Sequence, residues 1–132
     1  MTTPIVFERV VVDSSGWVEF LANGPKADRF APYLESQTAT ILLPSIVVYE
    51  VHKKLYREKG KGIADEFISQ AFGFRQQLID LTLELAISSS KTSLESGLSM
   101  ADAIIYTIAQ KYRAQLITSD AHFASLPSVT LI

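Results

Sequence analysis

Three consecutive valines, Val10, Val11 and Val12, constrain the fold of this chain more than any other stretch. A short, continuous run of β-branched residues is typical of a strand that is buried on both faces. Such strands belong to parallel sheets, because the helices that connect parallel strands cover both faces of the sheet. The run ends at Asp13, and the next residues favour a short helix opened by Ser14 or Ser15. The chain therefore begins with a strand–helix unit.

The same alternation of short apolar strands and helices continues to the end of the chain. We expect further strands at residues 40–43, 77–81, 115–118 and 129–132, and helices at 16–21, 26–35, 45–58, 63–72, 82–92 and 99–113. This pattern predicts an α/β fold, a three-layer α/β/α sandwich with a central, mainly parallel sheet. The length of 132 residues favours a single domain that spans residues 1–132.

The stretch from Leu98 to Tyr106 places a carboxylate at the start of a helix that faces the core. Ser99 is expected to cap the first turn, and Asp102 to complete a capping box three residues later. Apolar residues then recur with helical spacing and predict a buried stripe, made of Ala101, Ile104, Ile105, Ile108 and Tyr112. A carboxylate beside buried surface needs a partner, and a cation is a natural one.

Three other acids occupy positions from which they can reach Asp102. Asp13 and Asp120 each follow a predicted strand, and ligands of parallel α/β sheets bind at the carboxyl ends of the strands. Glu50 lies among apolar residues on the helix at 45–58, where a carboxylate is rarely buried unless it is paired or bound to metal. Each acid also has an ordinary interpretation: a helix cap or turn for the two aspartates, and a surface-facing side chain for Glu50.

A cluster of these acids has a clear chemical use. Neighbouring carboxylates repel one another, and a divalent cation removes that repulsion. Carboxylate oxygens suit Mg²⁺ or Mn²⁺, and the chain offers no cysteine and only two histidines for a zinc site. Such ions activate water and hold a phosphodiester, which makes a net charge of −2 compatible with a nucleic-acid substrate.

The composition also bears on disulfides, cellular location, membrane association and disorder. The absence of cysteine excludes disulfides, and together with an N-terminus that lacks a signal-peptide pattern it makes the cytoplasm the expected location. No apolar run approaches the ~20 residues of a membrane span, so no membrane association is expected. An apolar fraction of 48% argues against disorder.

Taken together, these motifs resemble the PIN domains, and among them the VapC-type toxin ribonucleases of type II toxin–antitoxin systems. The matching segments are residues 10–15, Glu50, residues 99–103 and residues 117–123, in this order and in a chain of matching length. Trp17 departs from the family pattern, which more often has a small aliphatic residue there.

The resemblance implies a Mg²⁺- or Mn²⁺-dependent endoribonuclease, a hydrolase that cleaves RNA phosphodiester bonds. Its metal ligands and catalytic acids would be Asp13, Glu50, Asp102 and Asp120. The resemblance also implies a homodimer and a cognate antitoxin protein that covers the site. Ser14 and Thr118 match hydroxyl positions near the acids, where they would orient a carboxylate or a metal-bound water.

Several alternatives stay open. A catalytically silent PIN-like module that binds RNA or protein would share the fold, although it has no need of four costly carboxylates. A phospho-accepting receiver-like domain would want a lysine after the last core strand, and residues 118–120 offer none. His122 could lie near substrate, but a surface turn is the favoured interpretation. Five basic residues either contact phosphate or form a solvated helix end, the favoured interpretation: Lys53, Lys54, Arg57, Lys59 and Lys61.

Overall fold

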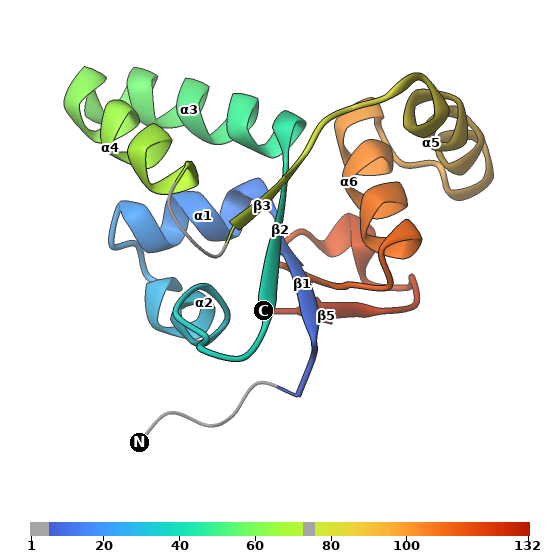
Figure 1. The fold of residues 1–132 in the computed structure, drawn as a ribbon, viewed down its shortest axis with the longest axis horizontal. Coiled ribbons are helices and arrows are strands. Elements are labelled where there is room, and N and C mark those ends of the chain that lie inside the picture. Colours follow the sequence, from blue (N-terminus) through green and yellow to red (C-terminus); the bar gives the residue numbers. More distant parts are fainter. Residues whose placement is uncertain (1–5, 73–75) are drawn as a thin grey trace.

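One parallel sheet organises the protein. The computed structural model describes residues 6–72 and 76–132, and within these ranges five strands form the sheet in the order β3-β2-β1-β4-β5 (Figure 1). The strands are β1 (Arg9–Val12), β2 (Thr40–Pro44), β3 (Gln76–Ile79), β4 (Gln115–Thr118) and β5 (Val129–Leu131). In the central strand, Val11 is aligned with Leu42 on one side and with Leu116 on the other. All three valines are fully buried, as their sequence pattern predicted.

Helices cover both faces of this sheet, which confirms the three-layer α/β/α sandwich. The helices are α1 (Ser14–Leu21), α2 (Ala27–Leu34), α3 (Ser45–Lys59), α4 (Lys61–Ala71), α5 (Leu83–Ser96) and α6 (Met100–Lys111), with a short 3₁₀ helix η1 (Ala121–Phe123). Figure 1 shows α1 to α4 on one side of the sheet and α5 and α6 on the other. All pairings between the described strands are parallel, so the sheet is more regular than the mainly parallel one that we expected.

Helix α5 extends beyond the end that the sequence predicts, at residue 92. Its serine-rich stretch is helical, and its hydroxyl groups donate to carbonyls one turn earlier, from Thr92 to Ser88 at 3.1 Å and from Ser96 to Thr92 at 2.6 Å. The helix ends at Gly97, whose positive φ of 77° gives the left-handed conformation typical of a helix C-terminus. At its other end the hydroxyl of Thr82 accepts from the Leu85 N–H and caps the helix.

Helix α6 is buried nearly all round, and not only along the stripe that its spacing predicts. Residues 103–109 are all buried, because α6 packs against α5 as well as against β1 and β4. Ala101 and Tyr112, at the two ends of the predicted stripe, are only partly buried. Despite this apolar surround, neither α6 nor any other helix in the described ranges has the length and apolarity needed to cross a membrane.

Trp17 fills the interface between α1 and α4. Its side chain is 2% exposed, and its ring meets that of Phe67 edge-on with the centroids 5.7 Å apart. A large aromatic pair of this kind stabilises helix packing beyond the area it buries. The residue that departs from the family pattern therefore serves the core and leaves the acids untouched.

Gly16 allows α1 to pack closely against α2 and β1. A Cβ at this position would lie 2.6 Å from the ring of Phe30 and 2.6 Å from Cγ1 of Val12. We therefore expect Gly16→Ala to lower the free energy of unfolding by about 1–3 kcal/mol, because the core is overpacked. Urea unfolding would measure it.

The control is Gly62→Ala in α4, where the added methyl group meets no atom within 4 Å. This substitution should raise stability by about 0.4–1 kcal/mol, because it restricts the unfolded chain. Equal effects of the two substitutions would contradict the packing described for Gly16.

Candidate active site

The strand order places a crevice at the centre of the carboxyl edge of the sheet. The chain runs outward from β1 through β2 to β3, and then returns to β4 on the other side of β1. The order reverses between β1 and β4, and open α/β sheets bind ligands at such a reversal. Asp13 follows β1 and Asp120 lies two residues beyond β4, so both strand-end acids flank this point.

Asp13 is the most deeply buried acid of the site, with 4% of its surface exposed. Its Oδ1 accepts from the backbone N–H of Ser14 at 2.8 Å, and its Oδ2 accepts from the hydroxyl of Thr118 at 2.8 Å. Asp13 itself is the N-cap of α1, a position that the sequence analysis gave to Ser14 or Ser15. Burial raises the pKa of Asp13, the two hydrogen bonds oppose this, and the charges of Asp102 and Asp120 raise it further.

Thr118 joins the two strand-end acids. Its fully buried hydroxyl donates to Asp13 and also accepts from the backbone N–H of Asp120 at 3.0 Å. One hydroxyl therefore fixes the orientation of a carboxylate after β1 and the path of the chain after β4. This agrees with the sequence interpretation of Thr118 as a residue that orients a carboxylate.

Asp102 enters the crevice from the first turn of α6. It is half-buried, and burial together with the charge of Asp120 raises its pKa, while a hydrogen bond from Ser99 and the charge of His122 lower it. Ser99 stands at the N-cap, but its side chain does not cap the backbone, so the predicted capping box is wrong. The Ser99 hydroxyl instead forms a hydrogen bond with the Asp102 carboxylate. Hydrogen bonds to a charged group are stronger than those between neutral groups.

Glu50 reaches the site from α3, which starts where β2 ends. Its carboxylate is half-buried and hydrogen-bonds to the side chain of Ser14. Burial raises its pKa, and the charges of Asp13 and Asp102 raise it further. Glu50 therefore faces the other acids and is not the surface-facing side chain of the ordinary interpretation.

The structure brings Asp102, Asp120 and His122 closest together. One ligand atom from each of these residues lies within 4.8 Å of the others. Asp13 and Glu50 are not part of this trio, but their charges act on the same cluster through Asp102. All four acids expected from the sequence thus converge on one crevice.

His122 is a member of this group for which the sequence favoured a surface turn and left a position near substrate as the alternative. Its ring Nδ1 is 3.1 Å from Oδ1 of Asp120, and its backbone N–H donates to the same oxygen at 2.9 Å. The side chain is 80% exposed, so His122 does lie in a surface turn, and the turn borders the acids. The spacing of two residues from a strand-end aspartate is the signal that could have found it.

The donor set fits a divalent cation. The cluster offers carboxylate oxygens and one imidazole, with no thiolate. Burial raises the pKa values of Asp13, Glu50 and Asp102, and neighbouring carboxylates raise them further. Hard cations favour such oxygen ligands, and a cation here would offset the repulsion between the acids.

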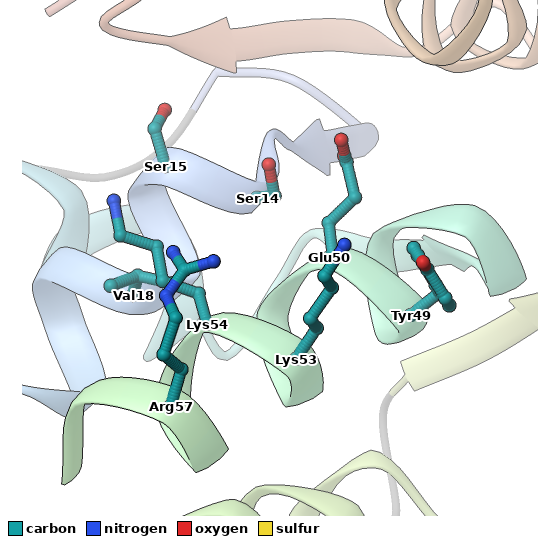
Figure 2. Close-up of a pocket in the computed structure, with 8 residues that line it drawn as sticks. All are labelled: Ser14, Ser15, Val18, Tyr49, Glu50, Lys53, Lys54 and Arg57. Atoms are coloured by element: carbon teal, nitrogen blue, oxygen red, sulfur yellow. The ribbon is translucent and has the colours of Figure 1, made fainter.

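A cavity of about 290 Å³ runs along α3 from Glu50, the one acid of the cluster that lines it (Figure 2). It is lined by Ser14, Ser15, Val18, Tyr49, Glu50, Lys53, Lys54 and Arg57. Asp102 and Asp120 are not in its lining, so the cavity extends away from the centre of the acid cluster. The sequence analysis favoured a solvated helix end for these cations. It overlooked that residues 50, 53, 54 and 57 recur with helical spacing and share one face.

The sequence model of the PIN domain family matches residues 10–128. The chain belongs to the PIN domain family. No curated protein sequence matches it.

Solved PIN-type structures share the fold over nearly the whole chain. VapC20 from Mycobacterium tuberculosis, described as a sarcin–ricin loop cleaving toxin, has a TM-score of 0.78 at 18% identity over 91% of this chain and 96% of its own. A toxin–antitoxin complex from Klebsiella pneumoniae gives 0.73 at 22% identity over 92% and 95%. VapBC2 from Rickettsia felis, bound to a promoter DNA fragment, gives 0.73 at 19% identity over 94% and 97%.

Without divalent cations, the free energy of unfolding should depend on pH through the acids of the cluster. The pKa values of Asp13, Glu50 and Asp102 are raised in the folded state above the ordinary values of 3.8 and 4.5. The folded state therefore holds more protons than the unfolded state just above these values, so the acids cost stability as the pH rises through the folded pKa. Glu50→Gln should recover about 0.5–1 kcal/mol at neutral pH and nothing below pH ~4.

Glu95→Gln, an exposed position on α5, is the matched control and should leave the pH dependence of the wild type unchanged. Chemical denaturation in EDTA between acidic and neutral pH measures both variants. A Glu50→Gln curve parallel to that of the wild type would contradict the proposed coupling of Glu50 to the cluster.

Proposed function

We propose that this PIN domain is a metal-dependent endoribonuclease and the toxin of a toxin–antitoxin pair. The observation that carries the proposal is the convergence of Asp13, Glu50, Asp102 and Asp120 at the switch point of the sheet. Buried carboxylates that lie close together lower the stability of the fold, and a bound cation would offset their charge. The fold shared with VapC20, described as a sarcin–ricin loop cleaving toxin, supports a nuclease activity.

We assign the four acids as ligands of Mg²⁺ or Mn²⁺. Such an ion, when bound, lowers the pKa of water and offsets negative charge on a phosphodiester. An oxygen-rich site of this kind suits Mg²⁺, which binds through a few carboxylates and the phosphate of its substrate. The net charge of −2 is then no obstacle to an RNA substrate.

Other residues of the chain hold these acids in place. The hydroxyl of Thr118 and the backbone N–H of Ser14 fix both oxygens of Asp13, and the side chain of Ser14 holds Glu50. The backbone N–H and the ring of His122 both contact Oδ1 of Asp120, and among residues 6–72 and 76–132 no hydrogen bond to its Oδ2 is found. Such outer contacts orient ligands before the ion arrives, and so reduce the cost of binding it.

We further propose a cytoplasmic protein that binds a cognate antitoxin and forms a homodimer. Structural relatives support the antitoxin as a partner. They include a toxin–antitoxin complex from Klebsiella pneumoniae and VapBC from Salmonella typhimurium bound to DNA. A largely apolar groove of about 510 Å³ between α5 and α6, with Leu94 and Met100 exposed, is the kind of surface that a second chain covers.

Cleavage of a mixed RNA pool tests the activity. Purified protein, free of any bound partner, should cleave with Mg²⁺ or Mn²⁺ and not with EDTA. Asp102→Asn should lower the rate at least ~100-fold, because it removes a metal ligand without changing side-chain size. Gel analysis of the pool over time measures the rate.

Asp28→Asn is the matched control, because Asp28 also lies in the first turn of a helix, α2, but is exposed and outside the acid cluster. This variant should cleave like the wild type. Full activity of Asp102→Asn would contradict the nuclease proposal. No cleavage under any condition, by partner-free protein, would favour the silent RNA- or protein-binding module.

A further inference from the structure

We propose that Lys53, Lys54 and Arg57 form a phosphate-binding wall that holds the RNA strand beside the acid cluster. This inference rests on the proposed function, and it names substrate-binding residues that the acids alone do not supply. The wall is the cationic part of the cavity along α3, and the RNA backbone is its occupant. Its contacts would be with phosphates, so it would grip the strand without reading its sequence.

The placement of the wall on α3 supports this assignment. Residues 50, 53, 54 and 57 lie three, four and seven positions along one helix, so they share the face that borders α1. Figure 2 shows Lys54 and Arg57 gathered at one side of the cavity, and Glu50 with Lys53 at the other, toward Tyr49. The cavity therefore passes from an acidic end at Glu50 to a basic end at Arg57.

The wall cations have no carboxylate partner within the described ranges. Ion pairs there join Lys61 to Asp65, Lys111 to Glu84 and His122 to Asp120, and none involves the wall. Lys53 is held by an aromatic contact instead, with its Nζ 5.6 Å from the ring centroid of Tyr49. Glu50 is the one carboxylate that lines the same cavity, and it forms no ion pair with these three cations, so they are suited to an anion from outside.

The stretch of α3 along the cavity, from Glu50 to the end of the wall at Arg57, suits a nucleic-acid strand in length. From Glu50 to Arg57 the helix rises by ~10 Å, which corresponds to about three phosphates of a stacked strand. The cavity also borders Ser14 and Ser15 of α1, so it is walled by two helices. A strand that follows this cavity would bring its next phosphate to the acids.

Electrostatics explains why the site needs such a wall. Four carboxylates repel a polyanion over about a Debye length, which is ~8 Å at physiological salt. The metal ions offset that charge only when they are bound. Three cations at the edge of the same crevice attract the backbone whether or not metal is present, and so raise the local concentration of substrate.

RNA binding by a variant that cannot cleave tests the wall directly. Asp102→Asn is the parent, and Lys53→Gln, Lys54→Gln and Arg57→Gln are added together. Fluorescence anisotropy of a short single-stranded RNA of mixed sequence gives Kd from about 50 to 200 mM salt. The wall variant should bind at least ~10-fold more weakly at low salt, and the slope of log K against log salt should fall by about 2, because three phosphate contacts are lost.

A charge-matched control separates the wall from net charge. Arg29→Gln, Lys59→Gln and Lys91→Gln remove three exposed cations outside the cavity and should weaken binding less than ~3-fold. All variants should unfold at similar temperatures, since the substituted side chains are exposed.

Equal loss in the two triple variants would overturn the wall, as would unchanged RNA affinity or no measurable binding by the parent. Unchanged RNA affinity is also the result expected if an acidic protein segment occupies the cavity. Because binding is read without cleavage, the wall and the nuclease proposal fail separately. If the wild type cleaves RNA but the three wall substitutions leave RNA affinity unchanged, the wall proposal fails and the nuclease proposal stands.

Discussion

A buried hydrogen bond between Thr118 and Asp13 connects the fold of this protein to its chemistry. It joins the ends of β1 and β4, the two strands between which the strand order reverses. The same Thr118 hydroxyl accepts from the N–H of Asp120, so a second acid depends on it. Without this link, a carboxylate with 4% exposure would have one donor fewer to offset its burial. The crevice therefore exists because the sheet topology and one hydroxyl place two strand ends together.

The acids that define the crevice oppose the stability of the fold that holds them. Burial and mutual repulsion raise the pKa values of Asp13, Glu50 and Asp102, and no lysine or arginine forms an ion pair with them in the described ranges. A protein keeps such a conflict where function requires it. The cations of α3 lie close enough to attract an anionic strand, yet they do not neutralise the acids. A divalent ion would then supply the compensation that the chain itself omits.

The sequence predicted the layers of the fold and the acids of the crevice for physical reasons. A run of buried valines and the alternation of strands and helices admit few architectures other than a parallel sheet. Acids at the ends of strands then meet at one edge, because parallel strands all end on the same side. Glu50 could be predicted because a carboxylate among apolar residues needs a partner.

The remaining features depend on side-chain directions that a linear pattern does not show. Ser99 has a typical capping position, but its hydroxyl turns to the charge of Asp102. The sequence grouped Lys53, Lys54 and Arg57 with two lysines that lie outside the cavity. The lining of the cavity is what distinguishes the three wall residues from those two. His122 joins the acids through a turn whose conformation sets its direction.

The central claim is that the four acids bind a divalent metal ion. Crystals soaked in Mn²⁺ would test it most directly, because anomalous scattering locates the ion without reference to activity. The account predicts a peak in contact with carboxylate oxygens of the cluster formed by Asp13, Glu50, Asp102 and Asp120, and its loss in Asp102→Asn. Mn²⁺ bound only elsewhere, or no bound Mn²⁺ in crystals with an open crevice, would contradict the account.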